Sequence, residues 1–206
     1  FAETPTLRRS NAFELVAQEC AAVREGVGLL DISGFSRFEV TGPNAQAWLS
    51  RVMAGRLPVP GRARLAPMLA PSGRLKGDLT VFNWGDGRWW IMGSYYLRNW
   101  HMRWFDDHRT DGVEVRDIAD AMVGFGLAGP KSREVLSALT HQDVDTALPF
   151  MGCATMDVGL IRARVARISV CGELGYEINC SAAEHITLRE ILLKAGAEQN
   201  IREFGF

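Results

Sequence analysis

The sequence predicts an α+β fold built from two similar βαβββα lobes with mainly antiparallel sheets. Strand-length runs of bulky, extended-favouring residues are separated by glycine-rich turns. In addition, landmarks recur 87 residues later: Gly42-Pro43 recurs as Gly129-Pro130, and Phe38 recurs as Phe125. A single period with turn residues at matching positions is typical of an internal repeat. We therefore expect two lobes related by a pseudo-twofold axis.

An N-terminal helix and a link, residues 1–35, are expected before the first lobe. Ser10-Asn11 can cap a helix that stops at Gly26, and residues 28–33 follow as an extended link. The apolar face of this helix is predicted to consist of Phe13, Val16, Ala17, Cys20 and Val23. We place the first lobe at residues 36–110 and the second at residues 111–206.

Local signals predict each element of the first lobe. Gly42-Pro43 separates a strand from a helix and puts proline at the first helical position. Gly85-Asp86-Gly87 predicts a hairpin, because Asp-Gly supplies the positive φ angles of a two-residue primed turn. Ser94 can cap the last helix. The expected elements are a strand at 36–41, a helix after Pro43, strands at 64–69, 75–84 and 89–93, and the helix after Ser94.

The second lobe follows from the offset of 87 residues. Trp48-Leu49, on the helix of the first lobe, falls on Val135-Leu136. The strand that carries Asp78 falls on residues 165–170, and residues 89–94 fall on residues 176–181. Ser181-Ala-Ala-Glu184 is a capping box. The last helix is therefore expected to begin at the same place in both lobes.

Composition and charge exclude several classes of function. With 47% apolar residues, 23% charged residues and a net charge of −1, the 206-residue chain lacks the basic surface that nucleic acids require. No apolar run approaches the roughly 20 residues of a membrane span. We expect no nucleic-acid partner and no membrane partner. The expected location is the cytoplasm, or the mitochondrial matrix if the protein is eukaryotic.

Spacing patterns predict neither a metal site nor a flavin site in this chain. The four cysteines lack CxxC spacing and are expected to be buried free thiols. The four histidines show no HxxxH or HExxH spacing. Gly124-Phe-Gly-Leu-Ala-Gly129 fits GxGxxG, but its glycines lie within a predicted strand rather than after one.

Asp78 is the candidate catalytic residue. It stands at the head of an apolar strand, where a carboxylate is either a turn or capping residue or a functional group. Matching strands of the two lobes should face one another across a central seam. Glu177, on the strand aligned with Trp89-Trp90, would approach the same seam. Two carboxylates would then look into one cleft.

Five segments together carry a family resemblance. They are Val23-Arg-Glu-Gly-Val-Gly-Leu-Leu-Asp-Ile-Ser33, Val40-Thr-Gly-Pro43, Pro67-Met-Leu with Gly73-Arg-Leu-Lys-Gly-Asp-Leu-Thr-Val81, Gly126-Leu-Ala-Gly-Pro130, and Gly172-Glu-Leu-Gly-Tyr-Glu-Ile178. This combination resembles the aminomethyltransferase folate-binding family, which includes the glycine-cleavage T-protein and the C-terminal halves of dimethylglycine and sarcosine dehydrogenases. Ser33-Gly-Phe35, where T-proteins usually carry Ser-His-Met, looks closer to the dehydrogenase branch.

The resemblance implies that tetrahydrofolate binds between the lobes. Asp78 matches the family's active-site aspartate, which would orient the folate amine and stabilise positive charge on a methylene-iminium species. Glu177 matches the glutamate that pairs with the pteridine, whose ring N–H and amino group offer two donors to a carboxylate. The residues expected to line the folate are Phe35, Leu65, Thr80, Ser94 and Phe150. Leu65 and Val170 depart from the family, because many T-proteins carry tyrosines there.

The predicted function is tetrahydrofolate-dependent transfer of a one-carbon unit from an amine-type donor. Two alternatives stay open: a folate-binding module of a dimethylglycine or sarcosine dehydrogenase-type flavoprotein, and a non-catalytic regulatory protein with the same fold. The expected partners are folate, the amine donor, and an oxidase domain in the same polypeptide or a lipoyl carrier protein. Because the chain begins at Phe1 and lacks the family's C-terminal β-barrel, we expect a piece of a longer polypeptide.

Overall fold

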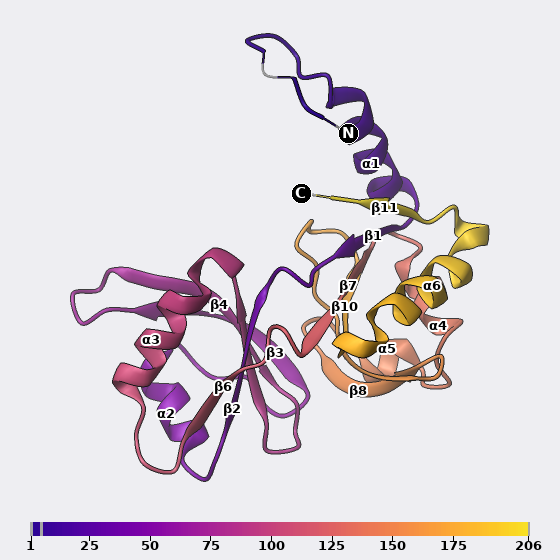
Figure 1. Ribbon diagram of the computed structural model, residues 1–206. Helices are drawn as coiled ribbons and strands as arrows, with labels where there is room; N and C mark the ends of the chain where they lie inside the picture. The colour runs from indigo at the N-terminus through magenta and orange to yellow at the C-terminus, as the bar shows by residue number, and fades with distance from the viewer. Residues whose placement is uncertain (1, 5, 206) are drawn as a thin grey trace.

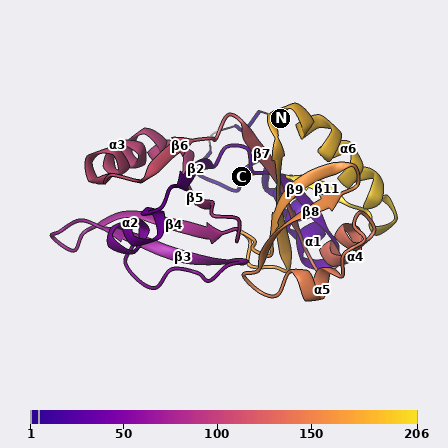
Figure 2. The same ribbon diagram turned by 90° about the horizontal axis from the view of Figure 1, so that it is seen from below.

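Two β-sheets face one another, and helices cover their outer sides (Figure 1). The structure is a computed structural model that describes residues 2–4 and 6–205. Seen from below, α2 and α3 lie at one end of the molecule and α4, α5 and α6 at the other (Figure 2). The layers therefore run helix, sheet, sheet, helix, and this α+β arrangement confirms the predicted fold class.

Each lobe contains the predicted order of strand, helix, three strands and helix, and the second lobe has one additional short helix. The helices are α1 (Phe13–Glu25), α2 (Ala45–Val52), α3 (Arg98–His108), α4 (Ser132–Ser137), α5 (Val144–Ala147) and α6 (His185–Ala195), with short 3-10 turns η1 (Tyr95–Leu97), η2 (Ala182–Glu184) and η3 (Ala197–Gln199). The strands are β1 (Gly28–Asp31), β2 (Ser36–Thr41), β3 (Arg62–Leu69), β4 (Leu75–Asn83), β5 (Trp89–Gly93), β6 (Glu114–Asp117), β7 (Met122–Ala128), β8 (Cys153–Val158), β9 (Ile161–Ala166), β10 (Gly175–Ser181) and β11 (Arg202–Phe204).

The internal repeat is visible in the strand registers. Phe38 pairs with Ile91 on β5, and Phe125 pairs with Ile178 on β10, so both partners are displaced by the same 87 residues. The segments η1 and α3 of the first lobe recur as η2 and α6 with identical lengths. The repeated landmarks in the sequence therefore mark equivalent positions in two similar units.

The two units exchange their first strands. The first sheet has the order β3-β4-β5-β2-β6, and the second has the order β11-β1-β7-β10-β9-β8. β6 pairs with β2 through Val40 and Val115, while β1 pairs with β7 through Leu127 and Leu29. Sheet membership thus crosses the boundaries that we predicted at residues 35 and 110.

Three apolar clusters hold the layers together. One packs α2 and α3 on the first sheet around Trp48 and Phe105. A second packs α4 and α6 on the second sheet around Leu136 and Leu188. The third lies between the sheets and consists of Ala63, Phe82, Trp84, Trp90, Met92, Cys153 and Ala166. The space between the lobes is therefore partly filled, mainly by aromatic residues of the first lobe.

Several local predictions are wrong in detail. Residues 28–31 form β1 rather than a simple link, because they complete the second sheet. The apolar face of α1 is largely exposed, and Val23 is its one buried member. The hairpin turn has positive φ at Gly85 and Gly87 and not at Asp86, so it is wider than a two-residue primed turn.

The cysteines differ from the prediction as well. Cys153 and Cys180 are buried free thiols as expected, but Cys20 and Cys171 are exposed. Burial raises the pKa of Cys153 to about 12 and that of Cys180 to about 11, so both thiols stay protonated at neutral pH.

Within the described residues, no helix has the length and apolar character that a membrane span requires.

Candidate functional site

Most of the predicted site residues of the first lobe lie on the face of its sheet that is turned toward the second lobe. Arg37, Met92, Thr80 and Leu65 form one row across β2, β5, β4 and β3. Continuing these registers toward the strand ends places Phe35, Ser94 and Asp78 in the neighbouring row. Strand alternation puts both rows on one face, since residues two apart point the same way. The strand pairing thus gathers Phe35, Leu65, Asp78, Thr80 and Ser94.

Asp78 is exposed, although it lies at the head of an apolar strand. It pairs across the ladder with Pro67 on β3. Gly77 and Leu79 on either side of it are buried, so the strand is anchored while the carboxylate is open to solvent. Among the described residues, none forms a hydrogen bond or an ion pair with the Asp78 carboxylate.

Glu177 lies in the middle of the opposing face, on β10. Its cross-strand neighbours are Gly126 on β7 and Ala166 on β9. Both are small, so no large side chain stands beside the carboxylate within its own sheet. The residue is 6% exposed, and the described part of the chain gives its carboxylate no hydrogen-bond donor. Glu177 is therefore a buried acceptor whose neighbours within the sheet are small.

Burial dominates the electrostatics of Glu177. Loss of water raises the pKa of its carboxyl to about 7, although the nearby positive charge of Arg37 opposes this rise. A buried carboxylate without donors is costly. A ligand that brings N–H donors would relieve that cost.

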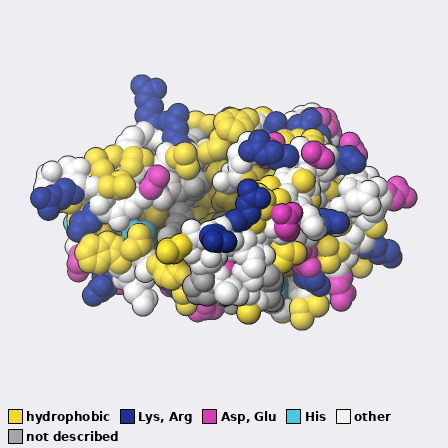
Figure 3. All heavy atoms as spheres, turned by 90° about the horizontal axis from the view of Figure 1, so that it is seen from above, with side chains coloured by type: hydrophobic (Ala, Val, Ile, Leu, Met, Phe, Trp, Pro, Cys, Tyr) yellow, Lys and Arg dark blue, Asp and Glu magenta, His cyan; other side chains and the backbone are white. Residues whose placement is uncertain are grey.

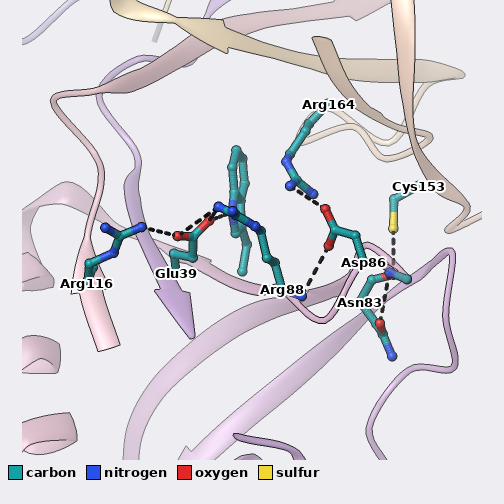
Figure 4. Close-up of polar contacts among 9 residues, drawn as sticks. Glu39, Asn83, Asp86, Arg88, Arg116, Cys153 and Arg164 are labelled. Carbon is teal, nitrogen blue, oxygen red and sulfur yellow. Dashed lines mark hydrogen bonds and ion pairs between the residues drawn. The ribbon is translucent and has the colours of Figure 1, made fainter. Parts of the chain in front are cut away.

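A second buried carboxylate, Glu39 on β2, is fully paired (Figure 4). Its oxygens accept hydrogen bonds from Arg116 at 2.6 Å and from Arg88 at 3.2 Å, and the Trp90 indole N–H lies 3.5 Å away. Burial acts to raise the pKa of Glu39, but these hydrogen bonds together hold it below its usual value. Glu39 has no free acceptor capacity comparable to that of Glu177.

Contacts between the lobes meet beside this cluster. Arg164 of β9 donates to Asp86 in the β4–β5 turn at 2.8 Å (Figure 4). Its guanidinium lies over the rings of Trp84 and Trp90. The Cys153 thiol donates to the carbonyl oxygen of Asn83 at 3.5 Å. These contacts join the lobes at the end of β4 that is distant from Asp78.

Cavities lie on both sides of the seam. One of about 410 Å³ is lined by Asp31, Phe35, Ser94, Tyr95 and Tyr96 among others. A much narrower one, about 10 Å³, reaches Glu177 and Gly126 and is also lined by Val170. The face seen from above is hollowed near its middle, with hydrophobic side chains gathered around the hollow (Figure 3).

Phe150 lines a different cavity from Phe35 and Ser94. It is 70% exposed and lines a separate cavity of about 460 Å³ together with Arg56, Arg62 and Arg64. It follows α5 and precedes β8, at the edge where Arg62 bridges to Gly152. Neither of the two cavities near the predicted site includes Phe150.

Sequence reasoning missed Arg37 and Asn179. Arg37 is fully buried and donates through Nε to the Asn179 side-chain oxygen at 2.9 Å, joining β2 to β10. The signal was the alternation in β2, where Arg37 and Glu39 interleave with apolar residues. Such alternation normally indicates a solvent-facing side, but here that side faces the other lobe.

Comparison with known proteins identifies the family. The chain matches the GCVT N-terminal domain over residues 1–206. It belongs to this family. Dimethylglycine dehydrogenase of Mus musculus is 33% identical over 98% of the chain, and aminomethyltransferase of Bacillus subtilis is 28% identical over 89%. The resemblance inferred from the five sequence segments is thereby confirmed.

GCVT-type solved structures share the fold. The aminomethyltransferase T of the glycine cleavage system from Bartonella henselae superposes with a TM-score of 0.80, at 22% identity, over 91% of this chain and 50% of that one. A chain of heterotetrameric sarcosine oxidase from Corynebacterium superposes with a TM-score of 0.66, at 19% identity, over 94% of this chain and 96% of that one. The chain spans 24% of the length of the dimethylglycine dehydrogenase and 51% of the length of the aminomethyltransferase.

Proposed function

We propose that this GCVT domain binds tetrahydrofolate between its two sheets and takes part in the transfer of a one-carbon unit from an amine-type donor. The observation that carries the proposal is Glu177, a buried carboxylate that receives no hydrogen bond from residues 2–4 and 6–205 and is flanked by Gly126 and Ala166. The relatives named as aminomethyltransferase and dimethylglycine dehydrogenase point to amine substrates.

The chemistry of Glu177 fits the pteridine ring. An ionised carboxylate has acceptors only, and the ring N–H and exocyclic amino group present two donors side by side. The small neighbours of Glu177 would let a flat ring approach it. Leu30 and Ile168, which line the same narrow cavity, supply apolar contacts for the ring faces. That cavity is too small for the ring as it stands, so binding would require the lobes or the loop at residues 167–174 to move.

Asp78 suits a different task. Tetrahydrofolate, when bound, would supply the amine nitrogens that accept the one-carbon unit. A carboxylate beside those nitrogens would orient them and stabilise positive charge as it develops on the reacting atoms. Asp78 is open to solvent and shares its row with Phe35 and Ser94, which line the 410 Å³ cavity. We assign Asp78 to charge stabilisation and Glu177 to binding.

Calorimetric titration of the full-length protein with 5-formyltetrahydrofolate tests the proposal. We expect saturable heat and an increase in melting temperature. If about millimolar ligand produces no heat and no thermal shift, folate is excluded as the ligand, because a site of any biological use binds more tightly than this.

A second candidate is a folate-binding module that serves a flavin oxidase domain. The observation in its favour is the higher identity to dimethylglycine dehydrogenase, 33%, than to aminomethyltransferase, 28%. The gene around this segment decides between the two. An upstream strand, GxGxxG turn and helix would indicate a dinucleotide-binding oxidase domain. A chain of aminomethyltransferase length would favour the first candidate.

A further inference from the structure

Arg37 is a fully buried cation whose hydrogen-bond partners are all neutral. Its Nε donates to the Asn179 side chain at 2.9 Å, and its Nη2 donates to the carbonyl oxygen of Ile32 at 2.9 Å. Nη1 donates to the carbonyl oxygens of Phe35 at 3.0 Å and Ser33 at 3.4 Å. The guanidinium therefore ties β2, the β1–β2 link and β10 together without forming an ion pair.

The positive charge of Arg37 acts on the Glu177 carboxylate. Glu177 and Asn179 lie two residues apart on β10 and so share the face that Arg37 contacts. No hydrogen bond joins Arg37 to Glu177 among the described residues, but the two charges act on one another through space. A buried cation and a buried anion each cost several kcal/mol when alone. Together they offset part of that cost while leaving the carboxylate oxygens available.

We propose that Arg37 is a positioning residue for ligand binding at Glu177. Its charge allows the carboxylate to ionise in a space closed to water, and its hydrogen bonds fix β10 against β2 so that the carboxylate faces the first lobe. This role rests on the proposed function, because it matters for a ligand that donates hydrogen bonds to Glu177.

The charges around the pair support this role. Burial lowers the pKa of Arg37 to about 10, so the guanidinium stays protonated at neutral pH, and Glu177, Asp31 and Cys180 are the groups that oppose this lowering. Burial raises the pKa of Glu177 to about 7, and Arg37 is the group that opposes it. Without Arg37 the carboxyl would titrate at a higher pH. The acceptor form would then be scarce at neutral pH.

The first test follows Glu177 itself in the ligand-free, full-length protein. Carbon-13 NMR of labelled glutamate side chains gives its titration midpoint, assigned by the signal lost in Glu177→Gln. We expect Arg37→Gln to move the midpoint upward by at least about one pH unit, and Arg37→Lys, which keeps the charge, to stay near wild type. Arg116→Gln is the matched control, because Arg116 faces Glu39 instead. An unchanged midpoint in folded Arg37→Gln would overturn the proposal.

The second test measures affinity for 5-formyltetrahydrofolate against pH. In wild type, affinity should fall as the pH drops below about 7, where Glu177 takes up a proton. Arg37→Gln should bind about tenfold more weakly near pH 7 and approach wild-type affinity near about pH 9. An equal loss at every pH would mean that Arg37 is merely structural. If wild type binds no folate at any pH, the proposed function fails, while the NMR midpoint still decides the role of Arg37.

A double variant keeps the test decisive if Arg37→Gln is unstable. Arg37→Gln with Glu177→Gln removes both charges, so it should melt higher than Arg37→Gln alone at about pH 8 and show no such gain at about pH 5. No rescue at the higher pH would contradict the coupling between the two side chains.

Discussion

The two lobes place different residues at the same cross-strand pair. In the first lobe, Glu39 on β2 lies opposite Trp90 on β5. In the second lobe, 87 residues later, Gly126 on β7 lies opposite Glu177 on β10. Each pair holds one carboxylate that is 5% to 6% exposed. Glu39 accepts hydrogen bonds from two arginines and an indole, whereas Glu177 lies opposite a glycine and receives no hydrogen bond from the described residues.

The difference shows how one scaffold can serve two purposes. The first lobe fills its inner face with Phe82, Trp84 and Trp90, and these rings build most of the cluster between the sheets. The second lobe contributes small residues there and leaves an acceptor unpaired. Satisfied buried charges indicate structure, and unsatisfied ones indicate a site where a ligand completes the hydrogen bonds. In the proposed site, the first lobe thus contributes an aromatic packing surface, and the second contributes the carboxylate that would bind the ligand.

The largest expected effect concerns Asp78, the exposed carboxylate of the site. Asp78→Asn keeps the shape of the side chain but removes the charge that would stabilise a cationic transition state. Single-turnover one-carbon transfer in the full-length protein should slow on the order of 100-fold or more, while folate affinity changes far less. Wild-type transfer rates in this variant would reduce Asp78 to a structural strand residue.

Glu177→Gln and Glu39→Gln form a matched pair for ligand binding. The first replaces an acceptor oxygen with a donor that would face the donors of the pteridine, so folate binding should weaken by roughly 1.5 to 3 kcal/mol. The second changes the paired carboxylate and should leave the dissociation constant within about threefold of wild type. Calorimetry on both variants checks this. Equal losses would mean that the two carboxylates are not functionally distinct.

The same pair should change stability with opposite signs. The pKa of Glu177 is 4.5 ordinarily and about 7 in the folded protein. The ligand-free protein therefore loses stability as the pH rises from the first value toward the second. Glu177→Gln should therefore stabilise the ligand-free protein by roughly 1 to 3 kcal/mol near pH 8 and by little near pH 4.5.

The lowered pKa of Glu39 acts in the opposite direction. Its contribution is present above the ordinary pKa of 4.5 and is lost as pH falls through the lower folded value. Glu39→Gln should cost roughly 1 to 3 kcal/mol near pH 7 and less in acid. Urea unfolding at several pH values measures both variants. Parallel pH dependences would contradict the assignment of one paired and one unpaired carboxylate.

The smallest effect tests the space beside Glu177. A methyl group at Gly126 would meet the Ile32 side chain at an ordinary 3.5 Å, so Gly126→Ala should fold normally and weaken folate binding by roughly 3- to 10-fold through lost room. Gly124→Ala is the contrast, because its methyl group would clash with the Ile178 carbonyl oxygen and unfold the strand pair. Unchanged affinity in Gly126→Ala would place the ligand elsewhere.

Much of the fold could be predicted from local signals that repeat. The strands at residues 36–41 and 89–93 have the predicted limits, and the helices after Ser94 and Ser181 begin as expected. The exchange of β1 and β6 between sheets could not be predicted, because strand pairing is non-local and a short apolar run fits either sheet. The burial of both faces of β2 was missed for the same reason.

The placement of the two carboxylates could be predicted in part from the family motifs, whereas their roles stay proposals. Asp78 and Glu177 lie on facing sheets, as expected from the strands that carry them. That Phe150 lines a cavity separate from Phe35 could not be predicted, because its position depends on how the loop after α5 meets β3. Arg37 was overlooked, because its hydrogen bonds come from backbone carbonyls and from Asn179, 142 residues away in the chain.

A crystal structure of the full-length protein with 5-formyltetrahydrofolate tests the central claim most directly. We expect the pteridine to lie between the two sheets, with its ring N–H and amino group within about 3 Å of the Glu177 carboxylate and with the hydrogen bonds of Glu39 unchanged. A folate bound outside this space, or one that leaves Glu177 without a donor, would contradict it.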